Sequence, residues 1–333
     1  MFGGISLRVI VDAFGGDDAP LAVLQGCELA LKEYDGVEIT LVGDIPTMKK
    51  VASEHQIDLS QMELIQADDI FDIHTDPVEI RRSMSNSSMA VGLKELAAGN
   101  GDAFLSAGST GALLVGATAF VKRIKGVKRA ALAPIMPSAT GCFMLIDGGA
   151  NLDCRPEMLQ QFGLMGSIYI NKIMEVPSPR VGLANIGAEE TKGGELQLEA
   201  YQLLKQSNIN FIGNVEARDI PLGACDVVVA DGFAGNMILK SVEGMGALMI
   251  KELKDMFFAS TKTKIAALLL KGQLKQFKKR MDYTEYGWAP LMGIAKPVIK
   301  AHGSSNPNAF KNAIRQAKEF VQKEVIHEII ANL

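Results

Sequence analysis

The sequence predicts an α/β protein with a doubly wound, mainly parallel, Rossmann-like sheet, and three observations lead to that fold class. Short apolar runs rich in Val and Ile recur along the chain, and a helix-length segment follows most of them, as in βα units. Most of these runs end at Gly, Asp, Asn or Ser. The 33 glycines outnumber the 14 Phe, 5 Tyr and 1 Trp, which indicates many tight turns between strands and helices.

The first βα unit is the clearest of the series. Residues 7–11 are predicted as a buried strand, the stretch DAFGGDDAP as a loop, and residues 20–34 as a helix with Pro in its first turn. Because no repeat, low-complexity tract or linker interrupts the series, we expect one α/β catalytic unit over residues 1–333, as a single body or with two lobes. Further strands are expected at residues 37–42, 62–65, 103–105, 130–133, 143–146, 181–184, 211–212, 227–230 and 298–301.

Charge and composition exclude several classes of protein. The chain has 34 Lys and Arg against 38 Asp and Glu, a formal net charge of −4, whereas extensive nucleic-acid binding needs a basic face. Hydrophobic residues make up 48% of the chain and charged residues 22%, which is ordinary for a folded protein. The four cysteines form no CxxC pair and the histidines no cluster, so we expect no metal site and a reducing environment.

The distribution of apolar residues favours a cytosolic protein. The apolar run at the N-terminus reaches Asp12 too soon for the core of a signal peptide. No stretch reaches the roughly 18 uninterrupted apolar residues of a membrane span. The hydrophobic content is therefore assigned to a buried core.

Residues 256–281 differ from their surroundings because they contain seven basic residues and no acid. Apolar residues recur at helical spacing and lysines follow one position later, which predicts a cationic amphipathic helix. Such a helix could lie on an anionic membrane surface, or it could pack against protein or a dimer partner with its lysines in solvent, and the two are compatible. The apolar positions are Leu270, Leu274, Phe277 and Met281, and the basic ones are Lys262, Lys264, Lys271, Lys275, Lys278, Lys279 and Arg280.

Polar, glycine-rich loops follow six of the predicted strands, and ligands of open α/β sheets bind outside the carboxyl ends of strands. We therefore expect these loops to converge on one crevice. The first contains Asp12, Gly15, Gly16 and Asp17. Its glycines allow the backbone to approach a ligand, and Asp17 or Asp18 could cap the next helix, although a capped turn alone would explain the loop equally well.

The second loop contains Ser106, Gly108, Ser109, Thr110 and Gly111 and opens a predicted helix. Free amide N–H groups and two hydroxyls at a helix N-terminus suit an anion, and a plain helix cap is the alternative. The GxxxxGK spacing is absent, which excludes an NTPase P-loop.

Two further loops carry carboxylates and amides beside glycines. In the third loop the carboxylates would repel a phosphate, so we expect them to accept hydrogen bonds from amides or to orient a cation or a substrate hydroxyl. The third loop supplies Asp147 and Asn151, and the fifth, after the apolar run DVVVA, supplies Asp231, Gly232, Gly235 and Asn236.

The fourth and sixth loops supply the candidate cation and histidine. Lys192, in the loop that begins at Asn185, is the best single candidate for contact with a substrate anion. His302 follows a predicted strand beside Gly-Ser-Ser, with Ser304 two residues later, and could reach the crevice or be structural. Because the cysteines lack a local His, thiolate catalysis is disfavoured. Residue chemistry alone predicts an α/β enzyme that binds an anion.

Read together, the motifs resemble one family along essentially the whole chain. The segments VDAFGGDDAP, DAFLSAGSTGALL, IDGGANLDCRPEMLQQFGLMG, RVGLANIGAEETKG, DVVVADGFAGN and YGWAPLMG…KPVIKAHGSSNPNAFKNAI are similar to the bacterial phosphate acyltransferases of phospholipid synthesis. Phe14 and Ser109 depart from the Met and Asn that the family pattern suggests, and Ser83 to Asn86 replace a lysine-rich stretch. The last departure leaves Arg81 and Arg82 as the nearby cations.

The resemblance implies transfer of a long fatty acyl chain from acyl carrier protein to inorganic phosphate, giving an acyl phosphate for a membrane glycerol-3-phosphate acyltransferase. It also implies a homodimer, no tightly held cofactor, and a fold related to phosphotransacetylases and isopropylmalate-type dehydrogenases. A short-chain phosphotransacetylase that uses acyl coenzyme A, an isopropylmalate-type NAD oxidoreductase and a non-enzymatic membrane-surface adaptor remain as alternatives.

On this hypothesis, Ser106 to Gly111 with Lys192 and His302 position phosphate, and glycine-loop amides approach the thioester. Asn151, Asn185 and Asn236 are candidate donors to the oxyanion. A second basic run, Lys122 to Arg129, is a candidate dock for the acidic carrier protein or a solvated loop.

Overall fold

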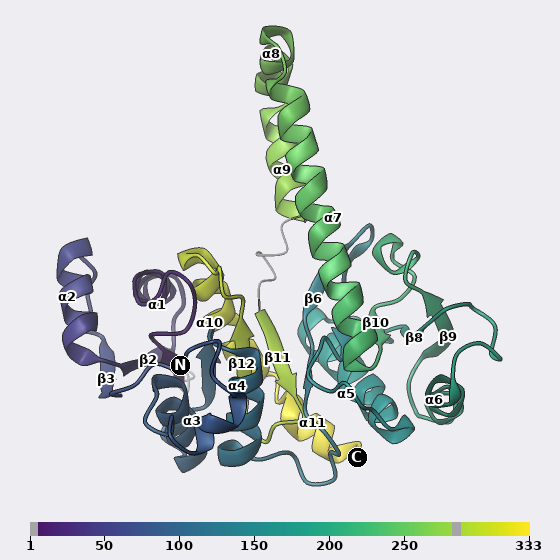
Figure 1. Ribbon diagram of the computed structural model, residues 1–333, viewed down its shortest axis with the longest axis horizontal. Helices are drawn as coiled ribbons and strands as arrows, with labels where there is room; N and C mark the ends of the chain where they lie inside the picture. Colours follow the sequence, from purple (N-terminus) through teal and green to yellow (C-terminus); the bar gives the residue numbers. More distant parts are fainter. Residues whose placement is uncertain (1–5, 282–287) are drawn as a thin grey trace, which may run out of the picture.

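Two mainly parallel β-sheets lie side by side, and a helical hairpin projects from between them (Figure 1). The computed structural model describes residues 6–281 and 288–333, with the backbone alone for 278–281. The seven-stranded sheet has the order β3-β2-β1-β4-β12-β11-β5, and the five-stranded sheet has the order β6-β7-β10-β8-β9. The alternation of strands and helices therefore predicts the fold class correctly.

The seven-stranded sheet is parallel from β3 to β12, and β11 runs antiparallel to both of its neighbours. Along β1, Val9 and Val11 belong to one buried cluster and Ile10 to another, so this strand buries both faces, as a doubly wound sheet requires. Its strands are β1 (Leu7–Asp12), β2 (Val37–Gly43), β3 (Met62–Gln66), β4 (Ala103–Ser106), β5 (Ala131–Leu132), β11 (Trp288–Met292) and β12 (Val298–Ala301).

In the five-stranded sheet, β7, β10, β8 and β9 are parallel and β6 is antiparallel to β7. Val227 and Val229 pack into one cluster and Val228 into another, so this sheet is also covered on both faces. Its strands are β6 (Ile135–Ser138), β7 (Gly141–Ile146), β8 (Val181–Asn185), β9 (Phe211–Glu216) and β10 (Val227–Val229).

The structure has a strand at each of the ten positions expected from the sequence. The sequence prediction misses β6 and β11. Both missed strands are antiparallel to a neighbour and contain a proline. Because neither is followed directly by a helix, neither carries the βα pattern on which the prediction rests.

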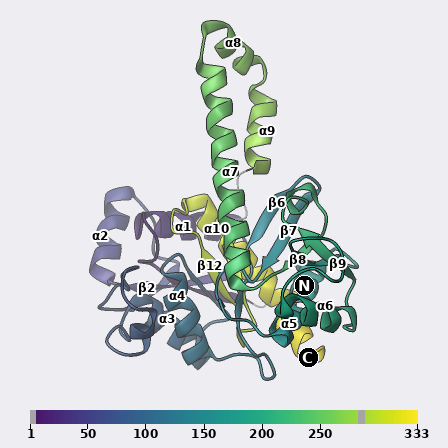
Figure 2. The same ribbon diagram turned by 45° about the vertical axis from the view of Figure 1, so that its right-hand side comes forward.

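Helices cover both faces of the sheets, and some of them pack together between the two sheets (Figures 1 and 2). The predicted first helix is confirmed, but its cap is wrong: the helix begins after Pro20 without a side-chain cap, and the Asp17 N–H donates to the carbonyl of Gly303 at 2.8 Å. The covering helices are α1 (Leu21–Glu33), α2 (Ile45–His55), α3 (Ser88–Ala98), α4 (Thr110–Gly116), α5 (Pro156–Met174), α6 (Glu195–Lys205), α10 (Pro307–Gln322) and α11 (Val325–Ala331).

The projecting hairpin corrects the single helix predicted for residues 256–281. Figures 1 and 2 show α7 (Gly232–Phe258) rising from the sheets, α8 (Thr261–Leu269) crossing at the tip, and α9 (Lys271–Met281) descending beside α7. Ser260 is extended and caps α8 through Thr263, so the chain turns where the sequence prediction continues straight.

The apolar stripe of α9 lines a groove shared with α7. Leu270, Leu274 and Phe277 lie opposite Met249 and Leu253 in this groove, whereas the lysines at 271 and 275 are exposed. Among the described hairpin residues, the most exposed large apolar side chains are those of Leu268 and Leu269 at the tip. The basic side chains of Lys278, Lys279 and Arg280, the Met281 side chain and the Tyr286-Gly287 start of one motif lie outside the described residues. Among the helices described, none has the length and apolar character needed to cross a membrane.

Candidate active site

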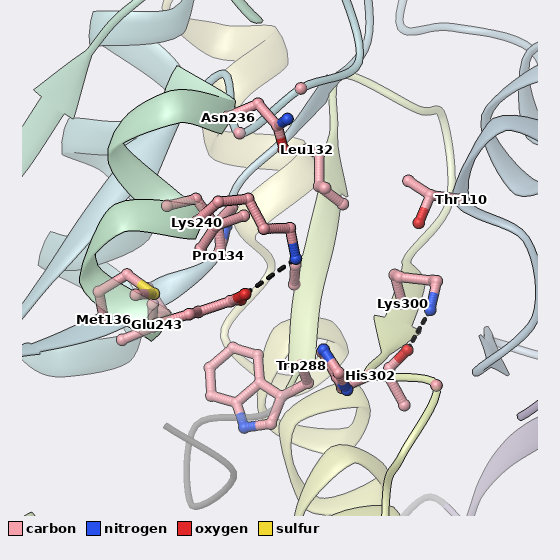
Figure 3. A pocket seen from close by; sticks show the side chains of 17 residues that line it. Thr110, Leu132, Pro134, Met136, Asn236, Lys240, Glu243, Trp288, Lys300 and His302 are labelled. Atoms are coloured by element: carbon pink, nitrogen blue, oxygen red, sulfur yellow. Dashed lines mark hydrogen bonds and ion pairs between the residues drawn. The ribbon is translucent and has the colours of Figure 1, made fainter. Parts of the chain in front are cut away.

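A pocket of about 320 Å³ lies where the two sheets face each other, within the range of small-molecule sites. Its lining comes from the carboxyl ends of β4, β7 and β12, from β5, β6 and β11, and from the first turns of α7 (Figure 3). The second, third, fifth and sixth loops thus meet, as expected from the strand ends. The lining residues are Thr110, Leu132, Pro134, Ile135, Met136, Gly148, Gly149, Asn236, Leu239, Lys240, Glu243, Trp288, Ala289, Lys300, Ala301, His302 and Gly303.

The pocket combines apolar surface with polar groups, including Asn236 and the Lys240–Glu243 ion pair on α7. Pro134, Met136, Leu239 and Trp288 contribute apolar surface, while in Figure 3 Thr110, Lys300 and His302 lie together on the side opposite α7. A chain of methylenes and an anionic group could therefore bind in one cavity.

The first loop supports the pocket from behind. Buried Asp12 accepts hydrogen bonds from the hydroxyls of Ser88 and Ser106, both at 2.6 Å, and from the Phe14 N–H at 3.2 Å. Burial raises the pKa of Asp12, against the lowering effect of these donors. These hydrogen bonds show that Asp12 holds loops together, and its contact with substrate stays a prediction.

The glycines of this loop allow three backbone segments to approach closely. A Cβ on Gly15 would stand 2.7 Å from the Gly108 amide nitrogen, and one on Gly16, whose φ is +107°, would stand 3.0 Å from the Gly303 carbonyl. Ser106 Oγ also accepts the Gly108 N–H at 3.0 Å. These glycines therefore serve packing between loops.

The residues of the predicted anion loop at the start of α4 make different contacts. Ser109 is the N-cap and accepts from the Ala112 N–H, while Gly111 packs against Pro77, which a Cβ would meet at 2.7 Å. Of this loop, Thr110 is the residue whose side chain reaches the pocket.

Asp147 and Asn151 stabilise the loop after β7. Buried Asp147 accepts five hydrogen bonds, from the amides of Leu132, Gly149, Ala150 and Asn151 and from the Asn151 side chain. The Asn151 Nδ2 group also donates to the Ala130 carbonyl at 2.8 Å, so both of its hydrogens are used. Asn151 therefore has no side-chain hydrogen left to donate to an oxyanion.

The first turn of α7 sits tightly on that loop. Asp231 is its N-cap and accepts from the Phe233 and Ala234 amides at 3.0 and 2.9 Å. A Cβ on Gly232 would meet the Asn151 backbone at 2.5 Å, and one on Gly235 the Asp147 carbonyl oxygen at 1.8 Å. These three residues position the helix, and Asn236, the next residue, is delivered to the pocket.

His302 follows β12 and lies half-buried in the pocket wall. Its Nδ1 receives the Ser304 N–H at 3.2 Å and lies 2.9 Å from the Ser304 hydroxyl. Since a backbone amide can only donate, Nδ1 is an acceptor and the neutral ring carries its hydrogen on Nε2. Burial lowers the pKa of His302 below its ordinary value, so the ring is neutral at pH 7.

The sequence prediction does not single out the charged and aromatic pocket residues Lys240, Glu243, Trp288 and Lys300. Lys240 and Glu243 form an ion pair of 2.8 Å on α7 (Figure 3). Lys300, 9% exposed, lies within the buried strand VIKA. A lysine between apolar strand residues was the available signal, since lysine is almost never fully buried without a function or a partner.

The fourth loop lies beside this pocket and does not line it. Asn185 closes the loop on itself, accepting from the Ile186 N–H at 2.8 Å and donating to the Lys192 carbonyl at 3.0 Å, and the Lys192 side chain is exposed. The strand order places β8 next to β10, so Lys192 follows the strand adjacent to the one that precedes Asn236. Its role stays a prediction.

Neither a metal site nor a reactive thiol is found in the described part of the chain. No group of His, Cys, Asp and Glu there could hold a metal ion. Burial raises the pKa of Cys154 to about 11 and that of Cys225 to about 12, and it raises the pKa of Cys27 and Cys142 as well. These thiols stay protonated at neutral pH and are poor nucleophiles.

The basic run from Lys122 to Arg129 is exposed at the far end of the helical segment that begins at Thr110. The run begins after this helical segment and ends three residues before Leu132, which lines the pocket. Its use as a dock for a carrier protein stays a prediction.

Comparison with known proteins finds a matching family model and similar sequences. A family model described as fatty acid synthesis protein matches residues 7–328. The chain is 47% identical to the phosphate acyltransferase of Clostridium botulinum (strain Loch Maree / Type A3) over 325 residues, 98% of the chain and 97% of the relative. It is 48% identical to that of Thermoanaerobacter pseudethanolicus over 323 residues, 97% and 96% of the two chains.

Solved structures with the same fold are phosphotransacetylases. The EutD phosphotransacetylase from Staphylococcus aureus superposes with a TM-score of 0.61 at 17% identity, covering 95% of each chain. A phosphotransacetylase from Streptococcus pyogenes gives 0.61 at 17% identity and covers 96% of this chain and 95% of its own. These likenesses confirm the predicted relation to the phosphotransacetylase fold.

Proposed function

The chain belongs to the fatty acid synthesis protein family, and we propose that it transfers a long-chain fatty acyl group from acyl carrier protein to inorganic phosphate. The product is an acyl phosphate, which a membrane acyltransferase consumes to acylate glycerol 3-phosphate in phospholipid synthesis. The chain is thus an acyltransferase whose substrates are a thioester and an anion.

The observation that carries this proposal is a pocket that combines apolar surface with hydrogen-bonding groups. Trp288, Met136 and Leu239 offer apolar surface for the acyl chain, and Thr110 and His302 offer hydrogen bonds. A volume of about 320 Å³ suits the reacting end of the substrate. Its position, at the carboxyl ends of strands from both sheets, is where such folds bind ligands.

The transfer needs no acylated enzyme residue. An oxygen of hydrogen phosphate forms a bond to the thioester carbon, the carbon–sulfur bond breaks, and sulfur leaves with the electron pair. The proton of hydrogen phosphate finishes on that sulfur, so the products are acyl phosphate and free thiol. The pocket must hold the reacting atoms about 3 to 3.5 Å apart and stabilise the oxyanion.

His302 and Asn236 are the best-placed donors for that oxyanion. A neutral imidazole with its hydrogen on Nε2 donates without transferring a proton, and the Asn236 side chain faces the pocket from α7. Lys192, next along the same edge of the five-stranded sheet, could join from the neighbouring loop when substrate is bound.

The hairpin supports a further part of the proposal, contact with the membrane and with a second copy of the chain. Leu268 and Leu269 at its tip are 70% and 79% exposed, and the lysines beside them suit anionic headgroups. The apolar groove between α7 and α9, which includes Leu274 and Phe277, suits a homodimer contact.

The decisive experiment is phosphate-dependent release of free thiol from palmitoyl acyl carrier protein, compared with palmitoyl and acetyl coenzyme A. We expect release to require phosphate and to be fastest with the carrier-protein substrate. Faster reaction with acetyl coenzyme A would identify a short-chain phosphotransacetylase instead. No phosphate-dependent release from any thioester would refute acyl transfer.

A further inference from the structure

Lys300 occupies a position where a charged residue is unexpected. It lies on β12 between β4 and β11, in register with Ser106 on one side and Ala289 on the other. Its strand neighbours Ile299 and Ala301 are fully buried, and Lys300 itself is 9% exposed, towards the pocket. Burying an ammonium is unfavourable unless an opposite charge compensates it.

The ammonium is held in place but is not neutralised by a direct ion pair. Its Nζ donates to the carbonyls of Ala107, at 3.1 Å, and Ala301. None of the ion pairs among the described residues includes Lys300. An ammonium has three hydrogens, and within the described chain no acceptor is in reach of the third.

Other charged groups act on the ammonium without forming a direct ion pair with it. Asp12 and Asp17 lie near enough to favour the ammonium, while Lys240 on α7 opposes it. Lys300 makes its hydrogen bonds to carbonyls and not to Asp12, whose oxygens accept from Ser88, Ser106 and Phe14. Figure 3 shows Lys300 beside Thr110 and His302, on the side of the pocket opposite α7.

We propose that Lys300 is a catalytic residue that binds the attacking phosphate, donating its third N–H to a phosphate oxygen while the other two stay on the carbonyls. This inference rests on the proposed acyl transfer and identifies the residue that holds the nucleophile. Lys300 stays protonated throughout, and its charge offsets the repulsion between the phosphate and the developing oxyanion.

The pH dependence of phosphate binding follows from the same burial. Desolvation lowers the pKa of Lys300 to about 8, against the opposing effect of Asp12 and Asp17. Below that pH Lys300 is already protonated when phosphate binds. Above that pH Lys300 must take up a proton when phosphate binds. The KM for phosphate should therefore rise about tenfold per pH unit above about pH 8.

The test compares Lys300→Met with a matched control, Lys296→Met. Lys296 lies on the loop before the same strand and donates to the Leu96 carbonyl at 2.7 Å, outside the pocket. Loss of one charged hydrogen bond to phosphate should raise the phosphate KM of Lys300→Met about 10- to 100-fold. Its KM for the acyl thioester and the phosphate KM of the control should stay near wild type.

A second variant and a binding measurement keep the test independent of folding and of turnover. Lys300→Arg keeps its charge at alkaline pH, so it should abolish the rise in phosphate KM above about pH 8. The increase of Tm by inorganic phosphate alone should be present in the wild type and absent in Lys300→Met.

The outcomes separate the two proposals. An unchanged phosphate KM in Lys300→Met, or a wild-type phosphate KM that is constant from about pH 8 to about pH 10, would overturn the role of Lys300. Phosphate binding that depends on Lys300 in a protein that releases no thiol from any thioester would support the site and refute acyl transfer.

Discussion

Replacing Gly235 by Ala tests whether the close contact between α7 and the loop after β7 positions the active site. A Cβ at this position would stand 1.8 Å from the Asp147 carbonyl oxygen, about 1.6 Å less than the 3.4 Å of ordinary contact. The loop cannot retreat easily, because five hydrogen bonds hold the Asp147 side chain. Helix α7 must therefore shift, and Asn236 and Lys240 shift with it.

Two quantities should change in Gly235→Ala. Overpacking should lower the free energy of unfolding by about 1 to 3 kcal/mol, more than the gain of up to about 1 kcal/mol from the helix propensity of Ala. A displacement of about 1 Å at the pocket should lower kcat about 100-fold. Urea denaturation and steady-state thiol release measure the two effects.

Gly244 on the same helix supplies the control. It is exposed, and a Cβ there would meet nothing within 4 Å. Gly244→Ala should keep kcat and raise the free energy of unfolding by up to about 1 kcal/mol. If Gly235→Ala matched the wild type in both stability and kcat, the argument that this contact positions α7 would be refuted.

Three further predictions concern His302, Lys192 and the hairpin tip. His302→Ala should lower kcat about 100- to 1,000-fold, and a variant with wild-type kcat would exclude His302 as a donor. Lys192→Ala, at an exposed position, should keep its Tm and lower turnover at saturating phosphate at least about tenfold, and near-wild-type turnover would remove Lys192 from the site. Replacing Leu268 and Leu269 together by Asp should release the protein from anionic vesicles in co-sedimentation, and continued sedimentation would contradict membrane contact through the tip.

Several site residues could be named from the sequence because strand ends are local features. Thr110, Asn236 and His302 each follow a run that ends in small or polar residues, and the carboxyl ends of parallel strands share one edge. The roles of their neighbours could not be assigned in this way. Asp147 and Asn151 have the chemistry of substrate ligands, but their hydrogen bonds go to the protein itself.

The same limit explains the error in the hairpin. Helical spacing in residues 256–281 is a property of the sequence, and it predicts helix correctly for most of the segment. The turn at Ser260 depends on a single extended residue whose side chain caps the next helix. Which way the apolar stripe faces depends on α7, and no local pattern contains that information.

By itself, the sequence determined the α/β class, ten of the strands, the six polar loops and the family resemblance. The reason is that strand–helix alternation and sequence motifs depend on residues that are neighbours in the chain. Only the tertiary structure decided which loop residues face the pocket and which face each other. It also revealed Lys300, since its burial depends on β4 and on Ala107 in the loop after it, 193 residues before Lys300 in the chain. Burial and hydrogen-bond occupancy are properties of surroundings, and they decide which polar groups remain for a substrate.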